Sequence, residues 1–483
     1  MLPSAIVVLG LGLRLYYLNH QSVWYDEIFS ISVSGRPLRE MAQYLVKDFV
    51  QPPLHYYILH FWFKLVGFGT YQSRLLSVVL GTLAIVASYC LANYLFGRRA
   101  ATIAALLLAV SQLGVMYSQE ARPYAQLLFL LPCCAYLFMV ALRTGRAGPW
   151  WAFVCTVTLV VYTHYYGFFA VAAFLLFAFL YRKRYPVPVS RWIGGFLLAL
   201  VLYLPWLTSG FIGEWHHSSK SLAHAPTRNN LPWWGVLSAL NTFNNGRSAG
   251  VLDSSPWWTF VLGGLLFGVP ALIALQPLLK EPHNPDEQLV RENLAFLALL
   301  FIIPFSAGLG VAFKSGAYSI RYITFATVPY YLLVARGMSA LHRATLRAAV
   351  VVACGAYSLY SLHATYVVPY KEDYRNAYAF LAQSRQPTDC YVAAPPWEER
   401  QVQWAWSIYH QGEPAMTLTP LDSFASGQNN CERVWLISVM YQSTPPAVAR
   451  SKQARAMLEQ RYTRIEARRY FWIDLDLYAR RNQ

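Results

Sequence analysis

The chain has 483 residues, of which 56% are hydrophobic, 16% are aromatic and only 13% are charged. A soluble globular domain has about 25% charged residues, so this composition excludes a disordered chain, a small disulfide-stabilised protein and an ordinary soluble enzyme. Most of the chain is expected to lie in a lipid bilayer. The net charge of +16 therefore bears first on membrane orientation, and we expect no nucleic acid among the partners.

Eleven apolar segments are candidate membrane-spanning helices, because a helix needs roughly 20 mostly apolar residues to cross the hydrocarbon of a bilayer. Two of them are shorter and are separated only by His164-Tyr165. We expect the first segment to be a retained helix rather than a signal peptide, because it lacks a basic amino-terminal region and is interrupted by Arg14. The predicted spans are residues 2–18, 74–96, 100–117, 123–142, 150–164, 166–181, 192–209, 257–278, 293–313, 321–340 and 347–366.

Basic residues gather in alternate short loops between the predicted spans. Cytoplasmic loops of membrane proteins carry an excess of Lys and Arg, so we expect these loops and the amino terminus to be cytoplasmic. The carboxyl terminus and two long loops, roughly 19–73 and 210–256, are then predicted to be extracytoplasmic. The basic loops contain Arg98-Arg99, Arg143 and Arg146, Arg182-Lys183-Arg184, Lys280 and Arg291, and Arg343 and Arg347.

The composition changes after about residue 366, since residues 367–483 hold 12 of the 23 acidic residues and no segment long enough to span a bilayer. We therefore expect a transmembrane domain over 1–366, with an outer loop at about 19–73, and a small extracytoplasmic α/β domain over 367–483. The elements predicted in the tail are helices at 373–384 and 446–460 and strands at 390–394, 434–438 and 470–477.

Cys390 and Cys431 are the only cysteines of this tail, and both stand next to predicted strands. An extracytoplasmic compartment permits disulfides. A disulfide between them and two separate thiols are both consistent with the sequence.

Two adjacent carboxylates, Asp26 and Glu27, follow the first predicted span by only a few residues. Acidic residues at the boundary between water and lipid are suited to act as a general base or as metal ligands. The alternative is a structural role in the first turn of a helix, where the helix dipole favours negative charge.

Further polar residues stand at the predicted outer ends of other spans. Glu120 and Arg122 lie in one short turn, His164 lies in another, and Arg321 begins the tenth span. An arginine at a helix start faces an unfavourable dipole, which an anionic partner such as a phosphate would relieve. Each residue has a structural alternative, such as a Glu–Arg bridge or a hydrogen-bonded boundary histidine. Their occurrence together at one predicted membrane face favours a functional site.

The order of these motifs resembles that of the C-type glycosyltransferase superfamily of polytopic membrane proteins. Within it, the chain is most similar to the bacterial protein O-mannosyltransferase and aminoarabinose (lipid A) transferase group. The resemblance covers roughly residues 5–365, and Lys371-Glu372-Asp373-Tyr374-Arg375 resembles the start of the outer domain in many bacterial members. The strings that carry it are Leu13-Arg14-Leu15, Trp24-Tyr25-Asp26-Glu27, Pro52-Pro53-Leu54, Gln119-Glu120-Ala121-Arg122-Pro123-Tyr124, Thr163-His164-Tyr165 and Arg321-Tyr322.

The resemblance implies a multi-pass enzyme of the bacterial inner (plasma) membrane. Such an enzyme takes a sugar from a polyprenyl-phosphate donor, such as one built on undecaprenyl phosphate, on the extracytoplasmic side. It implies that Asp26 is the catalytic acid, with Glu27 beside it, and that Arg122 lies near the lipid phosphate. Some relatives have a basic residue where this chain has Gln51, so Lys64 or Arg74 is expected to replace that phosphate contact.

A sugar bonded to a lipid phosphate already has a good leaving group, because the second pKa of a phosphate monoester is about 6. The reaction then needs one base for the acceptor hydroxyl and cations for the departing phosphate. We expect Asp26 to be the base and the displacement to invert the anomeric carbon. The expected phosphate ligands are Arg122, Arg321, Arg14 and Lys64, and the expected orienting residues are Glu120, His164 and Tyr124.

The sequence requires no cofactor. A divalent metal is compatible with the residue types of Asp26, Glu27, Glu120 and His164, although no spacing demands one. The expected partners are the polyprenyl-phosphate-linked sugar, membrane lipids, and a lipid, glycan or protein that accepts the sugar. The alternative functions are a transporter or flippase of polyprenyl lipids or glycans, which would need polar residues near the midplane of the bilayer, and a non-catalytic membrane scaffold.

Overall fold

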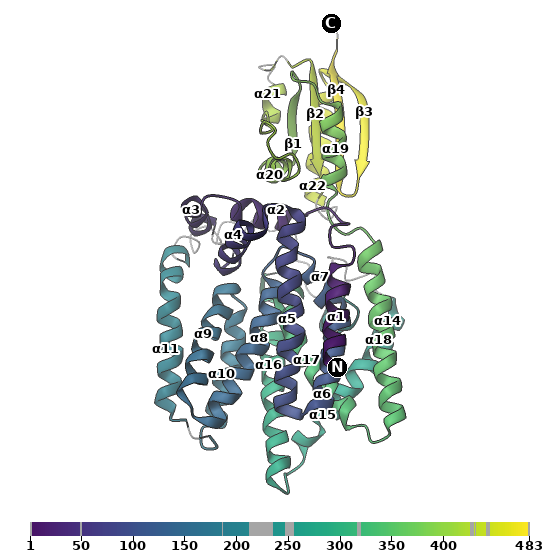
Figure 1. Cartoon of the computed structure of the whole chain (residues 1–483). Helices are drawn as coiled ribbons and strands as arrows, with labels where there is room; N and C mark the ends of the chain where they lie inside the picture. Colours follow the sequence, from purple (N-terminus) through teal and green to yellow (C-terminus); the bar gives the residue numbers. More distant parts are fainter. Residues whose placement is uncertain are drawn as a thin grey trace. The chain divides into compact units, whose positions relative to one another are not determined.

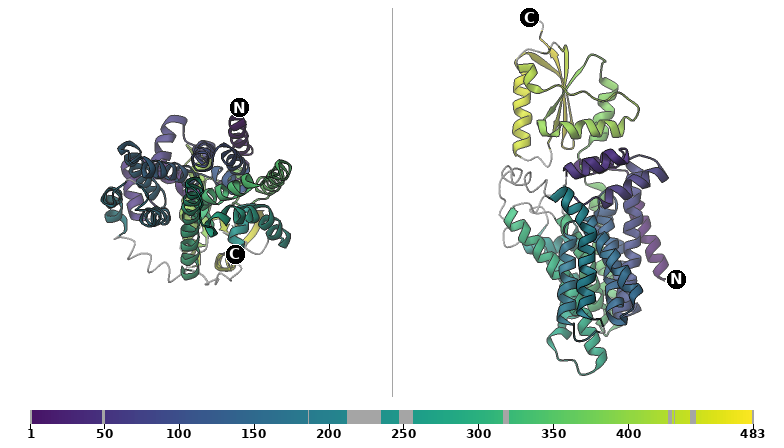
Figure 2. Two further views of the ribbon diagram at one scale, coloured as in Figure 1. Left: turned by 90° about the horizontal axis from the view of Figure 1, so that it is seen from below. Right: turned by 90° about the vertical axis from the view of Figure 1, so that its left-hand side faces the viewer.

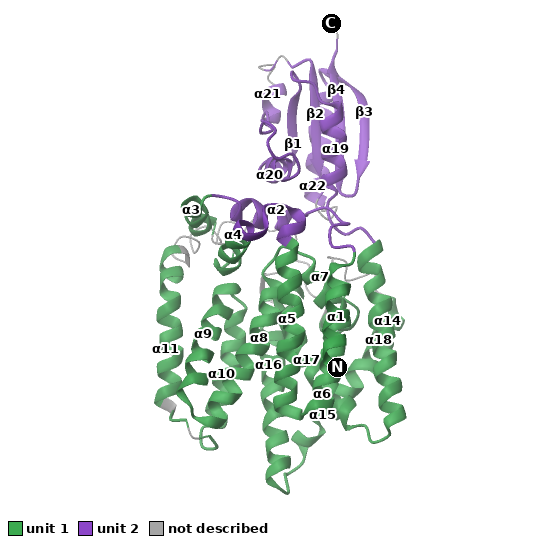
Figure 3. Cartoon of the chain, in the orientation of Figure 1, with its two compact units in different colours: residues 1–16, 37–62, 74–367 green, residues 17–36, 63–73, 368–483 purple. Residues whose placement is uncertain are grey.

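The computed structural model describes residues 2–48, 51–185, 187–211, 235–246, 256–315, 320–425, 429, 431–440 and 445–481. Most of the predicted outer loop 210–256 therefore lies outside the described residues. The chain forms two compact units, which Figure 3 distinguishes by colour. Unit 1 comprises residues 1–16, 37–62 and 74–367, and unit 2 comprises residues 17–36, 63–73 and 368–483.

The described part of unit 1 consists of helices, and the long ones lie side by side in a bundle (Figures 1 and 2). A 3-10 helix at Ile320–Ala326 precedes α17, and π-helical turns at Leu207–Phe211 and Gly264–Gly268 extend two spans. The α-helices are α1 Leu2–Leu15, α3 Leu38–Asp48, α4 Leu54–Val66, α5 Thr70–Phe96, α6 Arg98–Val110, α7 Gln112–Ser118, α8 Tyr124–Thr144, α9 Ala147–Thr163, α10 Gly167–Leu180, α11 Val189–Trp206, α13 Gly235–Asn245, α14 Trp257–Gly263, α15 Val269–Leu275, α16 Pro285–Ser315, α17 Thr327–Ala340 and α18 Ala344–Val367.

Each of the eleven predicted spans coincides with helix, but not all of these helices are long enough to cross a bilayer alone. Six helices in the described residues have sufficient length and apolar character, and the bent pair α6 and α7 is a seventh candidate. Helices at 3–15, 147–163 and 167–180 are apolar but shorter. The predicted span 321–340 is divided between the 3-10 helix and the 14 residues of α17. The chain is a multi-pass membrane protein.

The predicted continuous helix over 100–117 is wrong, because the chain bends by 56° between α6 and α7. Ser111 leaves helical geometry, with φ −58° and ψ 121°, and its hydroxyl accepts a hydrogen bond from the backbone N–H of Gly114 at 3.1 Å. A serine that caps a new helix in this way satisfies the backbone donors that the break exposes.

Unit 2 contains a four-stranded sheet in the order β1-β2-β4-β3. Strand β1 (Cys390–Ala394) pairs with β2 (Arg433–Val439) in parallel, whereas β2–β4 and β3–β4 are antiparallel. Helix α22 covers one face of the sheet, and α19 and α20 cover the other (Figure 2). The remaining elements of this unit are α2 Tyr25–Ser34, α19 Tyr374–Ser384, α20 Glu399–Tyr409, α21 Leu421–Ala425, α22 Pro445–Glu459, β3 Tyr462–Tyr470 and β4 Ile473–Arg480.

Alternation along β2 explains the three layers of this unit. Val434 and Leu436 pack with Leu458 of α22, whereas the ring of Trp435 lies 6.1 Å from that of Phe380 in α19. Successive side chains of a strand point to opposite faces, so the apolar run Val434-Trp435-Leu436-Ile437 of β2 needs a helix on both sides of the sheet.

Cys390 and Cys431 form a disulfide, with their Cα atoms 6.1 Å apart. The sequence left open a disulfide or two separate thiols, and the structure contains the disulfide. It joins the first residue of β1 to the segment directly before β2, and both cysteines pack against the apolar cluster under α22.

The division into units differs from the predicted domain boundary at residue 366. Residues 17–36 and 63–73, which the sequence assigns to the transmembrane domain, group with the carboxyl-terminal tail. The segment that carries Asp26 and Glu27 is therefore part of a unit whose largest segment, residues 368–483, follows more than 300 positions later.

Candidate active site

The residues that the sequence analysis selected fall into two groups. Asp26, Glu27 and Lys64 belong to unit 2. The others belong to unit 1 and are Arg14, Glu120, Arg122, Tyr124, His164 and Arg321. Each group is described on its own.

His164 lies at the break between α9 and α10, where the backbone is extended, with φ −158° and ψ 139°. Its Nδ1 accepts a hydrogen bond from the backbone N–H of Tyr166 at 3.1 Å. In the neutral ring the proton is therefore on Nε2, which is buried and has no hydrogen-bond partner within the described part of the chain. His164 thus presents an unused N–H donor in a buried environment.

Two arginines act electrostatically on this histidine. Burial lowers the pKa of His164 to about 3, and the positive charges of Arg122 and Arg321 contribute to this shift. The imidazole is therefore neutral at physiological pH. Of the predicted site residues, the fold brings His164, Arg122 and Arg321 together, although 199 positions separate Arg122 from Arg321. Two cations beside a neutral donor form a site suited to an anion.

Aromatic rings surround this group. The ring of Tyr124 lies 6.1 Å from that of His164, and the ring of Tyr322 lies 5.7 Å from it. The guanidinium carbon of Arg122 is 5.9 Å from the ring centre of Tyr124, and that of Arg321 is 5.3 Å from the ring centre of Tyr322. Contacts of this kind are within the range of cation–π attraction, so the rings help to hold the two guanidinium groups.

His55, Gln126 and Thr163, which were not predicted to belong to the site, form a hydrogen-bonded chain beside Arg122. The amide oxygen of Gln126 accepts from Nδ1 of His55 at 3.3 Å, and its amide nitrogen donates to the hydroxyl of Thr163 at 2.8 Å. Burial lowers the pKa of His55 to about 4, with a further contribution from Arg122. The available signal was a histidine directly after Pro52-Pro53-Leu54.

Arg14 is held by the break between α6 and α7. Its guanidinium donates to the carbonyl oxygens of Leu108 and Ala109, at 3.2 and 3.1 Å, and to the hydroxyl of Ser118 at 3.1 Å. A helix end leaves such carbonyls without intrahelical partners. These contacts account for the burial of Arg14, so we do not assign it to the phosphate.

The two carboxylates of unit 2 lie in the first turn of α2 but have different surroundings. Glu27 is fully buried, and its Oε2 accepts a hydrogen bond from Nζ of Lys371 at 3.0 Å in a salt bridge that is itself buried. Asp26 is partly exposed. Glu27 is buried in its salt bridge with Lys371. Of the two adjacent carboxylates, Asp26 is therefore the one that a substrate could reach.

Two further acids of unit 2, Glu372 and Glu398, were not predicted from the sequence, and Glu372 interacts electrostatically with Asp26. Burial raises the pKa of Glu372 to about 8, and the negative charges of Glu398 and Asp26 add to this effect. Burial also raises the pKa of Glu398 to about 7. Both side chains are therefore largely or partly protonated near neutral pH.

Lys64 and Glu120 are the remaining predicted site residues. Lys64 is exposed in the last turn of α4. Glu120 is buried, and its backbone carbonyl accepts a hydrogen bond from the N–H of Arg122 at 2.8 Å, which forms the tight turn before α8.

The suggested metal ligands do not form a metal site in the described residues, where no three His, Cys, Asp or Glu side chains gather. In addition, Glu27 is bound by Lys371 and Nδ1 of His164 is bound by Tyr166. We therefore derive no chemical step through a metal.

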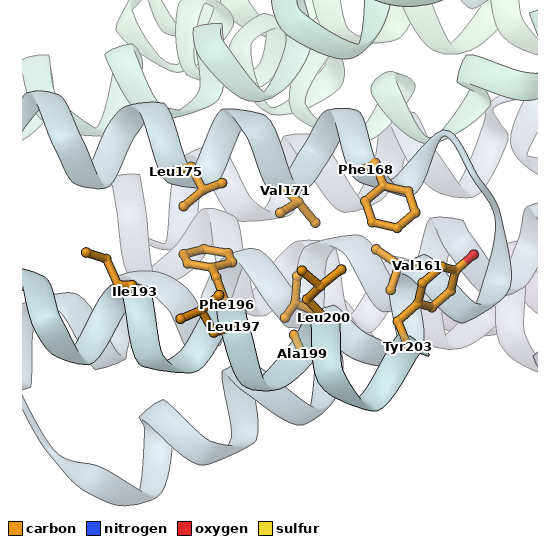
Figure 4. A pocket seen from close by; sticks show the side chains of 11 residues that line it. Val161, Phe168, Val171, Leu175, Ile193, Phe196, Leu197, Ala199, Leu200 and Tyr203 are labelled. Atoms are coloured by element: carbon orange, nitrogen blue, oxygen red, sulfur yellow. The ribbon is translucent and has the colours of Figure 1, made fainter. Parts of the chain in front are cut away.

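An apolar cavity of about 330 Å³ lies along α9, α10 and α11 (Figure 4). Phe168 and Tyr203 stand at one end of it, and Leu175 and Ile193 stand toward the other. Phe168 belongs to the first turn of α10, four residues after His164, so this end of the cavity is next to the α9–α10 break. The lining residues are Val157, Val161, Phe168, Val171, Leu175, Ile193, Phe196, Leu197, Ala199, Leu200 and Tyr203.

Residues 50–208 match the family of dolichyl-phosphate-mannose-protein mannosyltransferases. This segment includes His55, Arg122 and His164, whereas Asp26 and Arg321 lie outside it. No curated protein matches the chain in sequence.

Solved structures resemble the chain over nearly its whole length. ArnT from Cupriavidus metallidurans bound to undecaprenyl phosphate is 14% identical, with a TM-score of 0.59, and the match covers 98% of this chain and 97% of that one. The Archaeoglobus fulgidus oligosaccharyltransferase in complex with zinc and sulfate is also 14% identical, with a TM-score of 0.58, over 96% of this chain and 71% of that one. AglB from the same organism, in complex with an inhibitory peptide and a dolichol-phosphate, is 13% identical with a TM-score of 0.51, over 99% of this chain and 74% of that one.

These matches confirm the expected fold class, a helical membrane domain with a small carboxyl-terminal sheet domain. They also confirm the expected resemblance: the chain has the fold of the C-type glycosyltransferases and, over residues 50–208, the sequence pattern of the dolichyl-phosphate-mannose-protein mannosyltransferase family.

Proposed function

We propose that this chain is a membrane glycosyltransferase that moves a sugar from a polyprenyl-phosphate donor to a hydroxyl of a lipid, glycan or protein. The observation that carries this proposal is the convergence of Arg122, Arg321 and the neutral ring of His164 at one place in unit 1. The ring of Tyr124 lies beside both Arg122 and His164, and the ring of Tyr322 lies beside both Arg321 and His164. Two similar folds hold a polyprenyl phosphate, which is undecaprenyl phosphate in one and a dolichol-phosphate in the other.

The phosphate of the donor binds between Arg122 and Arg321, and the Nε2–H of His164 donates to one of its oxygens. Both arginines keep their charge throughout, so they stabilise the negative charge that develops as the sugar leaves. A neutral histidine can donate one hydrogen bond without a proton transfer, which leaves the proton of the reaction to another group.

The polyprenyl chain of the donor lies in the apolar cavity along α9, α10 and α11. The cavity wall is formed by aliphatic and aromatic side chains, which exclude water from a hydrocarbon chain. Its end at Phe168 is next to the α9–α10 break, so a lipid with its chain in the cavity has its phosphate near His164.

Asp26 is the general base. It takes the proton of the acceptor hydroxyl as that oxygen bonds to the anomeric carbon of the sugar. The bond between the anomeric carbon and the phosphate oxygen breaks at the same time, and polyprenyl phosphate departs with the electron pair. The leaving group needs no protonation, so a second catalytic carboxylate is not required, and the displacement inverts the anomeric centre.

The proposed location is the bacterial inner membrane, with the amino terminus in the cytoplasm. The proposed domains are the transmembrane domain over 1–366 and the outer domain over 367–483. The alternating basic loops support this orientation. A flippase or a scaffold with this fold would bind the lipid without forming a glycosylated product, so transfer from a purified donor by the purified chain separates these functions.

Replacement of Asp26 by Asn is expected to abolish transfer while the protein still folds. Removal of a general base typically lowers the rate by ~10²–10⁴-fold. The measurement is transfer of a radiolabelled sugar from a polyprenyl-phosphate donor, with Asp422→Asn, an exposed aspartate of α21, as the control. Full transfer by Asp26→Asn would reject Asp26 as the base.

Replacement of Arg122 or Arg321 by Gln is expected to weaken donor binding. A hydrogen bond to a charged group contributes about 1.5–3 kcal/mol, which corresponds to a rise in Kd of roughly 10–150-fold. Binding of polyprenyl phosphate to purified protein measures this effect. The exposed Arg343→Gln is the matched control, and equal Kd values for all variants would contradict a phosphate site here.

Leu175→Trp is expected to fill part of the cavity and to weaken binding of long-chain donors. Each excluded CH₂ loses ~0.8 kcal/mol of burial, so the loss of a few groups raises Kd at least about tenfold. The control is Leu176→Trp on the same helix, because Leu176 is similarly exposed but does not line the cavity. A donor with a very short chain should bind both variants equally, and an unchanged Kd for the long-chain donor with Leu175→Trp would show that the chain lies elsewhere.

A further inference from the structure

The first outer loop, residues 17–36, is built into the same compact unit as the tail. The tail enters this unit with the string Lys371-Glu372-Asp373-Tyr374-Arg375, to which the proposed reaction assigns no role. The side chains of three of its charged residues, Lys371, Asp373 and Arg375, make hydrogen bonds within unit 2. Asp373 caps α19, since its carboxylate accepts from the backbone N–H of Asn376 at 3.2 Å, and two of the others reach the loop that carries Asp26.

Lys371 contacts the loop through a buried ion pair. Its Nζ lies 3.0 Å from Oε2 of Glu27, and the exposed fractions of the two side chains are 2% and 0%. A buried charge is tolerated only when an opposite charge or hydrogen bonds compensate it. Each residue therefore fixes the position of the other, and Glu27 is the direct neighbour of Asp26 in the first turn of α2.

Arg375 contacts the backbone that leads into α2. One terminal nitrogen donates to the carbonyl of Asn19 at 2.7 Å and to that of His20 at 3.2 Å. The other donates to the side chain of Asn19 at 3.1 Å and to the carbonyl of Gln21 at 3.4 Å. Three successive carbonyls are thus held by one guanidinium, whose rigid planar fork suits such an arrangement.

Helix α20 of the tail holds the loop on both sides of Asp26. The hydroxyl of Tyr409 accepts from the backbone N–H of Val23 at 2.9 Å. After Asp26, the ring of Phe29 lies 6.1 Å from that of Trp404, and the guanidinium carbon of Arg36 lies 5.3 Å from the same indole. The segment that carries Asp26 is therefore fixed by tail residues before and after the carboxylate.

We propose that Lys371 and Arg375 are positioning residues, through which the carboxyl-terminal unit holds Asp26 in the geometry for proton abstraction. This inference rests on the proposed function. It gives the tail a direct part in the reaction, because the base is built on a scaffold that residues 368–483 supply. Neither residue touches the reacting atoms in this proposal, and both act through the loop.

Lys371 also sets the charge around Asp26. Two titratable groups of unit 2 interact electrostatically with this carboxylate, namely Tyr25 and Glu372. Its neighbour in the sequence, Glu27, is paired with Lys371. Lys371 balances Glu27, and burial favours the neutral forms of Glu372 and Glu398. A substitution that changes the charge of the Glu27–Lys371 pair therefore changes the electrostatic surroundings of Asp26 while leaving Asp26 itself in place.

The first test is the kinetics of Lys371→Met in the full-length chain. A small displacement of a catalytic group can lower the rate by about 10²-fold, so kcat is expected to fall by that order. The KM for the donor is expected to stay within about twofold, because its phosphate ligands belong to unit 1. Lys452→Met, the same change at an exposed lysine of α22, is the control and should leave both constants unchanged.

The second test is the pH–rate profile of Glu27→Gln. The amide oxygen of Gln can still accept from Lys371, but the ammonium charge is no longer neutralised. The unneutralised positive charge changes the electrostatics of the loop that carries the base, so the acid limb of kcat is expected to move to lower pH. If the Glu27–Lys371 pair has only a structural role, the acid limb of the pH–rate profile is expected not to move in Glu27→Gln.

A third variant, Arg375→Lys, keeps the charge but loses the planar fork, and is expected to lower kcat less than Arg375→Met does. Unchanged kcat in Lys371→Met and Arg375→Met would overturn the inference. A loss of activity that only follows the amount of folded protein, with no shift of the acid limb in Glu27→Gln, would overturn it too. These outcomes leave the proposed function intact if Asp26→Asn is inactive, whereas an active Asp26→Asn rejects the base itself.

Discussion

An ion removed from water must be matched by an opposite charge or by hydrogen bonds, because the interior of a protein and the adjoining hydrocarbon solvate it poorly. This constraint explains the arrangement of the polar residues in both units. Glu27 is buried with Lys371, and Arg14 is buried with the carbonyls that the α6–α7 break leaves open. His164 meets the same constraint by staying neutral beside Arg122 and Arg321.

The two groups of site residues divide the proposed chemistry between them. In unit 1, the cations Arg122 and Arg321 and the neutral donor His164 suit the donor phosphate, which is anionic before and after the proposed reaction. In unit 2, a partly exposed carboxylate beside a neutralised pair suits a group that must gain a proton.

Much of this arrangement could be predicted from the sequence, and the remainder depended on long-range contacts. Apolar length located the helices, short apolar runs located β1 and β2, and a last strand was predicted at 470–477, where β4 begins at Ile473. The edge strand β3 was missed because most of its positions are exposed and several carry charge, as in Arg464, Arg468 and Arg469, so it shows no apolar alternation. Arg14 looked like a phosphate ligand because no local pattern predicts the break in the helix whose carbonyls it binds.

The interactions of the first outer loop were the least predictable part. Glu27 and Lys371 are 344 positions apart, and neither neighbourhood contains a signal for the other. The resemblance to a glycosyltransferase family selected Asp26 and Arg122 through their motifs, but it gave no role to Lys371 or Arg375. Their role follows only from the fold, which brings the loop and the tail into one compact unit.

Unit 2 is assembled from segments that are far apart in the sequence, and this has a consequence for biosynthesis. At ~5–20 residues per second, the ribosome needs roughly 17–70 s to add the 344 residues between Glu27 and Lys371. During that time the loop has been translated and its partner has not, and closure of so long a loop lowers the chain entropy further. The nascent protein would therefore complete its base only after the last membrane helix has been inserted, so an unfinished chain cannot act on donor lipids already present in the membrane.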